Sequence, residues 1–127
     1  MGRFLAAALA AGMLSACTPF VEVIDVSKVP PADMQAAQRI RIVTIDNAAP
    51  PDVAEYLGPI DAFSCKAVMT DPPATRGNAL QQLRYKALKL GADAIIEVTF
   101  DTRGTDAWGT NCWETVTASG SAVKLKK

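Results

Sequence analysis

The first 17 residues have the pattern of an export signal, and this feature decides which residues remain to fold and in which compartment. Arg3 supplies a positive charge, residues 4–14 form an uncharged and Ala-rich stretch, and Ser15, Ala16 and Cys17 follow. A membrane-spanning helix needs about 20 consecutive apolar residues, which this stretch does not provide. We therefore expect residues 1–16 to be a removable signal peptide rather than a permanent helical anchor.

The tetrapeptide Leu14-Ser15-Ala16-Cys17 resembles the lipobox of bacterial lipoproteins. The resemblance implies cleavage before Cys17, a diacylglyceryl group on its thiol and an acylated amine. Two or more acyl chains hold a protein firmly on a bilayer, whereas a single chain is marginal. By the same resemblance, Thr18 in place of Asp implies sorting to the outer membrane of a Gram-negative host, with the domain facing the periplasm. The alternative is an ordinary secretory signal followed by a chance cysteine.

Two cysteines remain once Cys17 is assigned to lipid, and they predict a disulfide. Cleavage leaves 111 of the 127 residues, with Cys65 and Cys112 as the remaining pair in an oxidising compartment. On the chain-entropy model, this bond stabilises the fold by about 4 kcal/mol. Two independent buried thiols or a redox pair are the alternatives. A C-x-x-C motif and an activating histidine, which a redox pair would want, are both missing.

Composition argues against several function classes. The chain has no histidine, which excludes Ser-His and Cys-His catalysis and His-ligated zinc. Neither G-x-S-x-G nor S-x-x-K is present, so we do not expect an enzyme, and we predict no cofactor. The 13 basic and 13 acidic side chains balance, which gives no electrostatic case for nucleic acid.

The mature chain divides into a lipidated N-terminus with a tether over 17–38 and a domain over 39–127. Residues 20–26 are β-branched and partly alternating, so they could form an edge strand. Pro30 and Pro31 then interrupt that pattern because proline lacks the backbone N–H. Fully extended, residues 18–38 would reach at most about 70 Å.

The domain is predicted to be a two-layer α+β fold: a mainly antiparallel sheet of about four strands, one principal helix and one disulfide. Leu80, Leu83, Ala87 and Leu90 form one apolar stripe that predicts the helix, and Gly91 would end it. Gly58-Pro59 marks a strand start or a bulge, and Gly120 a bulge or a close backbone contact. In the strand over 94–100, Ile96, Val98 and Phe100 are expected on one face, with Glu97, Thr99 and Asp101 on the other. The expected strands cover residues 40–45, 56–65, 94–100 and 113–125, the helix covers 75–90, and 47–52 form a turn.

Four short segments of the domain resemble the RcsF family of lipoproteins. They are residues 58–65, with the sequence GPIDAFSC, and residues 89–96, 109–113 and 118–123. The resemblance implies an outer-membrane lipoprotein that senses envelope damage and activates the Rcs phosphorelay through an inner-membrane regulator. It also implies contacts with the barrel assembly machinery or outer-membrane barrels. Cys65 and Cys112 match one disulfide of that family, whereas Phe100 and Ala118 stand where its well-studied members carry a second.

Two other functions and one candidate contact residue remain to be considered. A non-signalling structural lipoprotein needs the same anchor and the same stable domain. A small metal- or ligand-binding domain is suggested by related small domains that share the LGADAI sequence, and Asp93, Glu97 and Asp101 are its candidate carboxylates. Trp108, next to Gly109 in a polar loop, is either a contact for a protein partner or a lid on the disulfide.

Overall fold

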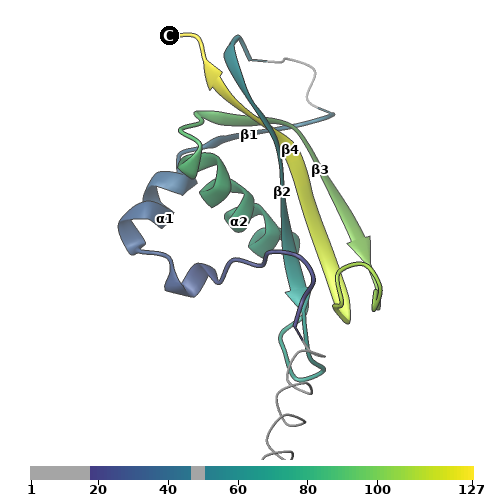
Figure 1. The fold of residues 1–127 in the computed structure, drawn as a ribbon. Helices are drawn as coiled ribbons and strands as arrows, with labels where there is room; N and C mark the ends of the chain where they lie inside the picture. Colours follow the sequence, from purple (N-terminus) through teal and green to yellow (C-terminus); the bar gives the residue numbers. More distant parts are fainter. Residues whose placement is uncertain (1–17, 47–50) are drawn as a thin grey trace, which may run out of the picture.

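The computed structural model describes residues 18–46 and 51–127 and confirms a small α+β domain. The predicted signal peptide and Cys17 therefore lie outside the described residues. The helix α2 (Arg76–Lys89) packs on one face of a four-stranded mixed sheet, and α1 (Pro31–Gln38) packs against α2 (Figure 1). No helix of the described part of the chain is long and apolar enough to cross a bilayer. The elements are the 3-10 helix η1 (Val26–Lys28), the helices α1 (Pro31–Gln38) and α2 (Arg76–Lys89), and the strands β1 (Arg41–Thr44), β2 (Val53–Lys66), β3 (Ala94–Arg103) and β4 (Glu114–Leu125).

The strand order is β1-β3-β4-β2, so β1 and β2 are the two outer strands. The pairs β3–β4 and β4–β2 are antiparallel, and β1 pairs in parallel with β3. The main core lies between α2 and the sheet and includes Leu83, Ile95 and Val98. A second, smaller cluster of Val43, Ala94, Ile96 and Val123 lies on the opposite face, which we call the open face.

The predicted helix is confirmed almost residue for residue, because its boundaries are set by local chemistry. The Thr75 hydroxyl accepts a hydrogen bond from the backbone N–H of Asn78 (3.1 Å), which caps the first turn. After the helix, Gly91 has a φ of +76°, a conformation that glycine adopts without strain. The stripe is only partly right, because Leu90 is the exposed C-cap residue, whereas Gln82 is fully buried.

A bulge in β3 corrects the predicted faces of that strand. Glu97 has a φ of +54°, and Glu97 and Val98 together oppose Gly120 on β4. The extra residue reverses the alternation, so Ile96 faces the open side while Val98 packs into the main core. The prediction that Ile96 and Val98 share a face is therefore wrong. Gly120 is a close contact as expected, since a Cβ there would lie 2.9 Å from the Ile96 carbonyl oxygen.

Residues 18–38 differ from the expected free tether. Pro31 is the first residue of α1, a position where its missing N–H costs no hydrogen bond, and α1 lies beside α2. The edge strand expected over residues 20–26 is wrong, since the segment is irregular up to η1. Ser27 donates from its hydroxyl and its backbone N–H to the Asp25 carboxylate, and these bonds lower the pKa of that carboxyl.

Gln82 holds this N-terminal segment on the domain. Its side-chain Oε1 accepts a hydrogen bond from the backbone N–H of Ile24 (2.9 Å). Its Nε2 donates to the Phe63 carbonyl and to the Asn78 side chain, both at 2.8 Å. One buried amide thus joins α2, β2 and the segment that precedes η1.

Cys65 and Cys112 form the predicted disulfide. It joins the end of β2 to the loop before β4, near the end of the sheet where β3 also finishes (Figure 1). We call this the disulfide end: residues 18–20 and the loops 67–75 and 104–113. The C-terminus of the chain lies at the opposite end.

Candidate functional site: a pocket on the open face

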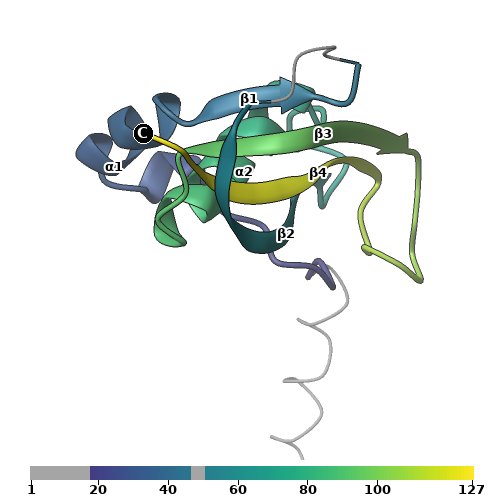
Figure 2. The ribbon, with the colours of Figure 1, turned by 90° about the horizontal axis from the view of Figure 1, so that it is seen from above.

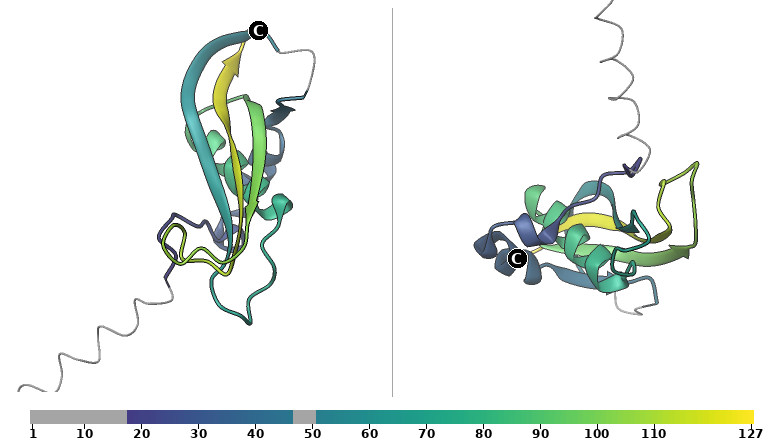
Figure 3. Two further views of the ribbon diagram at one scale, coloured as in Figure 1. Left: turned by 90° about the vertical axis from the view of Figure 1, so that its right-hand side faces the viewer. Right: turned by 90° about the horizontal axis from the view of Figure 1, so that it is seen from below.

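The sheet curls, and the curl forms a pocket on its open face. The β2–β4 pairing changes register between Val53 and Glu55 and again between Tyr56 and Gly58. Such bulges bend a strand and increase its twist. Gly58 has a φ of +124°, which a residue with a side chain rarely adopts, so the predicted bulge at Gly58-Pro59 is confirmed. As a result, the first half of β2 arches over the sheet (Figures 2 and 3).

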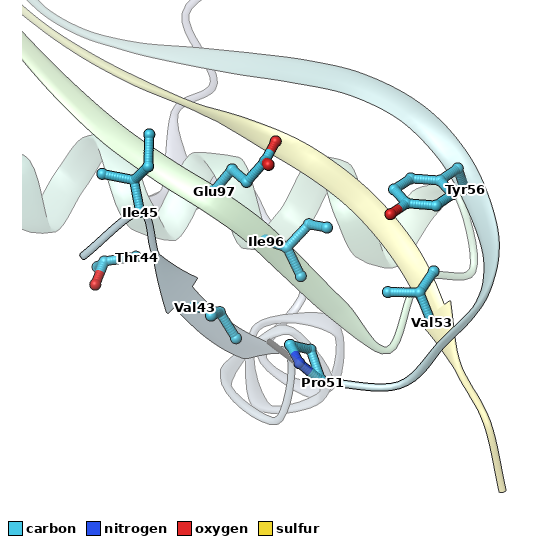
Figure 4. A pocket seen from close by; sticks show the side chains of 8 residues that line it. All are labelled: Val43, Thr44, Ile45, Pro51, Val53, Tyr56, Ile96 and Glu97. Carbon is cyan, nitrogen blue, oxygen red and sulfur yellow. The ribbon is translucent and has the colours of Figure 1, made fainter. Parts of the chain in front are cut away.

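The pocket has a volume of about 250 Å³ and is lined from both outer strands. Val53 and Tyr56 of β2 stand on one side, and β1 and β3 supply the other side (Figure 4). The hydroxyl end of Tyr56 points toward the β3 side. The lining residues are Val43, Thr44, Ile45, Pro51, Val53, Tyr56, Ile96 and Glu97.

Glu97 is the single charged residue among these lining residues, and it is the residue of the β3 bulge. A non-glycine residue with positive φ is uncommon, and such conformations cluster at functional sites. The bulge places this carboxylate at the rim of a pocket whose other walls are mainly aliphatic. The hydroxyl groups of Thr44 and Tyr56 are the other polar side-chain groups that line the pocket.

The three carboxylates predicted as possible metal ligands are not brought together. Asp93 accepts a hydrogen bond from the Leu125 N–H (3.0 Å), and Asp101 pairs with Arg103 (2.9 Å). Only Glu97 reaches the open-face pocket. Within residues 18–46 and 51–127, no group of three or more Cys, Asp or Glu side chains could hold a metal ion.

Trp108 does not act as a lid on the disulfide, because 96% of its surface is exposed. It lies in a tight turn that the Asp106 carboxylate organises by accepting hydrogen bonds from the N–H groups of Gly109 (2.9 Å) and Thr110 (3.2 Å). The exposure argues against the lid, whereas the contact for a protein partner stays a prediction. Trp113, which directly follows the disulfide residue Cys112, is also partly exposed.

Sequence reasoning did not identify the open-face pocket. Its lining comes from three strands that are distant in the chain, and their approach depends on bulges rather than on the residues that line the pocket. Gly58 was the one local signal. It indicated the bulge in β2, but it did not indicate the pocket that the bulge helps to form.

Comparison with known proteins gives one family match. The model of the family YbjQ_1, described as "Putative heavy-metal-binding", matches residues 64–126, from the end of β2 through β4. A crystal structure from Pediococcus pentosaceus ATCC 25745, described as a protein with unknown function of the DUF74 family, is 17% identical. It covers 68% of this chain and 98% of its own, with a TM-score of 0.49. Among curated proteins, none matches the sequence.

The residues that the structure describes do not fit a heavy-metal site. Soft metal ions prefer thiolate and imidazole ligands. The chain has no histidine, and Cys65 and Cys112 are bonded to each other. The heavy-metal ligand that the family description names therefore does not fit the described residues.

Proposed function

We propose that the mature chain is a lipid-anchored binding protein of the cell envelope whose domain takes a small organic cation in the open-face pocket. The observation that carries the binding function is the pocket itself, with the Glu97 carboxylate at the rim of an aliphatic cavity. The sequence of residues 14–17 supports the anchor. The match over residues 64–126 to a family described as "Putative heavy-metal-binding" supports a binding role.

The class of ligand follows from the chemistry of the walls. A carboxylate attracts a cation, whereas Val43, Val53 and Ile96 offer apolar surface to an alkyl group. The ring of Tyr56 adds a cation–π partner, which favours a substituted ammonium group. A cavity of about 250 Å³ is below the usual range for drug-sized ligands, so the ligand is a small molecule such as an alkylamine. A metal ion would find a single carboxylate, which is too few ligands for tight binding.

Substituting Glu97 tests the proposed function. We expect Glu97→Gln to weaken the binding of butylammonium and tetramethylammonium up to about fivefold, because an ion pair at an exposed carboxylate contributes at most about 1 kcal/mol. Gln keeps the size of the side chain and the backbone strain, so the melting temperature should change little. Isothermal titration calorimetry of the mature protein measures the affinities.

Asp61→Asn is the matched control, since it also removes one exposed carboxylate but does not line the pocket. It should bind the amines as the wild type does. Equal losses in both variants would show non-specific charge attraction. Tighter binding of Zn²⁺, Cu²⁺ or Cd²⁺ than of either amine would replace the organic cation with a metal ion.

A second candidate is the envelope-stress sensor of the Rcs phosphorelay that the RcsF resemblance implies. It is favoured by the register of the sheet: Phe100 and Ala118, which stand where that family carries a second disulfide, are direct cross-strand partners. Their side chains pack into the core, as an apolar pair must if it replaces a disulfide.

Transcription of the stress response after envelope damage in the native host tests this second candidate. If the chain is a sensor, its deletion abolishes induction, and Cys17→Ser alters signalling because the domain is no longer held at the membrane. Unchanged induction in both strains would favour a non-signalling lipoprotein.

A further inference from the structure

We propose that the disulfide end is a membrane-docking surface that seats the domain directly on the bilayer. Four large apolar side chains of this end are exposed: Phe20 (63%), Met69 (71%), Trp108 (96%) and Trp113 (46%). Both tryptophans of the chain are among them. The proposal rests on the proposed function in one respect, the acylation of Cys17.

Hydrogen bonds fix the start of the described chain to this surface. The Phe20 N–H donates to the Thr110 carbonyl, and the Asn111 side chain donates to the Thr18 carbonyl, both at 2.9 Å. The residue that follows the acylation site is therefore bound to the loop that carries Trp108. Figure 1 and the left view of Figure 3 show residues 18–20 beside the two loops of the disulfide end.

The loops that carry the apolar side chains are held to one another. The Trp113 N–H donates to the Lys66 carbonyl (2.7 Å), next to the Cys65–Cys112 disulfide. The Asp71 carboxylate accepts from the N–H groups of Ala67 and Val68, both at 3.1 Å, which closes the loop that carries Met69. Hydrogen bonds and the disulfide thus hold the segments that carry the four side chains, and these side chains are exposed on segments fixed by the fold.

A lipid surface fits this end better than a protein partner because of where the acyl chains would be. Consecutive residues are at most about 3.8 Å apart at their Cα atoms, so acyl chains on Cys17 would enter the bilayer beside Thr18. Because Thr18 is itself hydrogen-bonded to the domain, no free linker lies between Thr18 and the domain. The disulfide end would therefore be the part of the domain next to the bilayer. Tryptophan is enriched at membrane interfaces, where its ring is in the apolar region and its N–H meets water.

Trp108 fluorescence in vesicles tests the proposal. The lipidated mature protein with Trp113→Phe retains Trp108 as its single tryptophan. In vesicles of phosphatidylethanolamine and phosphatidylglycerol, we expect a blue-shifted emission that brominated lipids quench at least twofold. The matched control carries Trp108→Phe, Trp113→Phe and Tyr56→Trp, which moves the reporter to an exposed position near the other end of β2. Its emission should stay unquenched.

Mass spectrometry of Cys17 separates the possible failures. An unacylated Cys17 would overturn the docking proposal together with the anchor. An acylated, vesicle-bound protein with unquenched Trp108 would overturn docking alone and leave the anchor in place. Equal quenching of the two reporters would also overturn it, because no single end would then face the lipid. If Trp108 emission shifts only when a periplasmic or outer-membrane protein is added, the surface is a protein interface instead.

Discussion

Reduction of the Cys65–Cys112 disulfide is expected to lower the free energy of unfolding by about 4 kcal/mol. The bond closes a loop with a sequence separation of 47 residues, and the loss of this closure increases the entropy of the unfolded chain. Small domains are stable by only about 5–15 kcal/mol, so the loss of this bond would remove a large share of the total stability. Urea unfolding of the mature protein with and without reductant measures the difference.

The Cys65→Ser, Cys112→Ser double variant should reproduce the effect of reduction without any reductant. It should also loosen the loop over 104–113, because Cys112 is the residue that joins this loop to β2. Thiol reagents should not label the oxidised mature protein. Labelling of Cys65 or Cys112 without reduction, or a stability difference below about 1 kcal/mol, would contradict a structural disulfide.

Gln82→Met is expected to destabilise the domain by about 3 kcal/mol. Methionine has a similar size but cannot replace the hydrogen bonds of the amide with Ile24 and Phe63. Losing one partner leaves a buried donor or acceptor unsatisfied, at a cost of about 1–3 kcal/mol for each group. Chemical unfolding measures the loss of stability. Limited trypsinolysis should show faster cleavage after Lys28, an exposed residue of η1, because the N-terminal segment is released.

Gln81→Met is the matched control, since it makes the same chemical change on the same helix at a residue that is only half-buried. We expect it to change stability by less than about 0.5 kcal/mol. Equal destabilisation by the two variants, or unchanged cleavage after Lys28, would show that Gln82 does not hold the segment.

Features set by neighbouring residues could be predicted from the sequence. The helix α2 begins after its Thr75 cap and ends before Gly91, both of which are local signals. The disulfide was predicted from an expected oxidising compartment and from the two cysteines that remain if Cys17 is assigned to lipid. The positions of α2, β3 and β4 along the chain were therefore predicted closely, although the faces of β3 were not.

Features that depend on distant partners could not be predicted. The bulge at Glu97 arises opposite Gly120, and a pattern of alternating residues does not reveal where one extra residue enters. Gln82 is buried against Ile24 and Phe63, which are 58 and 19 residues away in the chain. The sequence around Gln82 therefore does not reveal its burial. The segment over 18–38 read as a tether because its burial against α2 is visible only in three dimensions.

The open-face pocket combines both kinds of feature. Its aliphatic residues belong to strands that were predicted, but its shape comes from the bulges in β2 and β3. The candidate carboxylate Glu97 was identified from the sequence with Asp93 and Asp101 as companions, and the fold separates these three side chains. A carboxylate without companions argues against a metal ion, which is why the proposed ligand is an organic cation.

The most direct test of the central claim is a ¹H–¹⁵N correlation NMR titration of the mature protein with butylammonium. Binding in the pocket predicts saturable shifts at Val43, Thr44, Ile45, Val53, Tyr56, Ile96 and Glu97, and none at the loops of the disulfide end. Glu97→Gln should weaken these shifts at equal ligand concentration. Shifts scattered over the whole surface, or none at saturating ligand, would contradict the assignment of this pocket as the binding site.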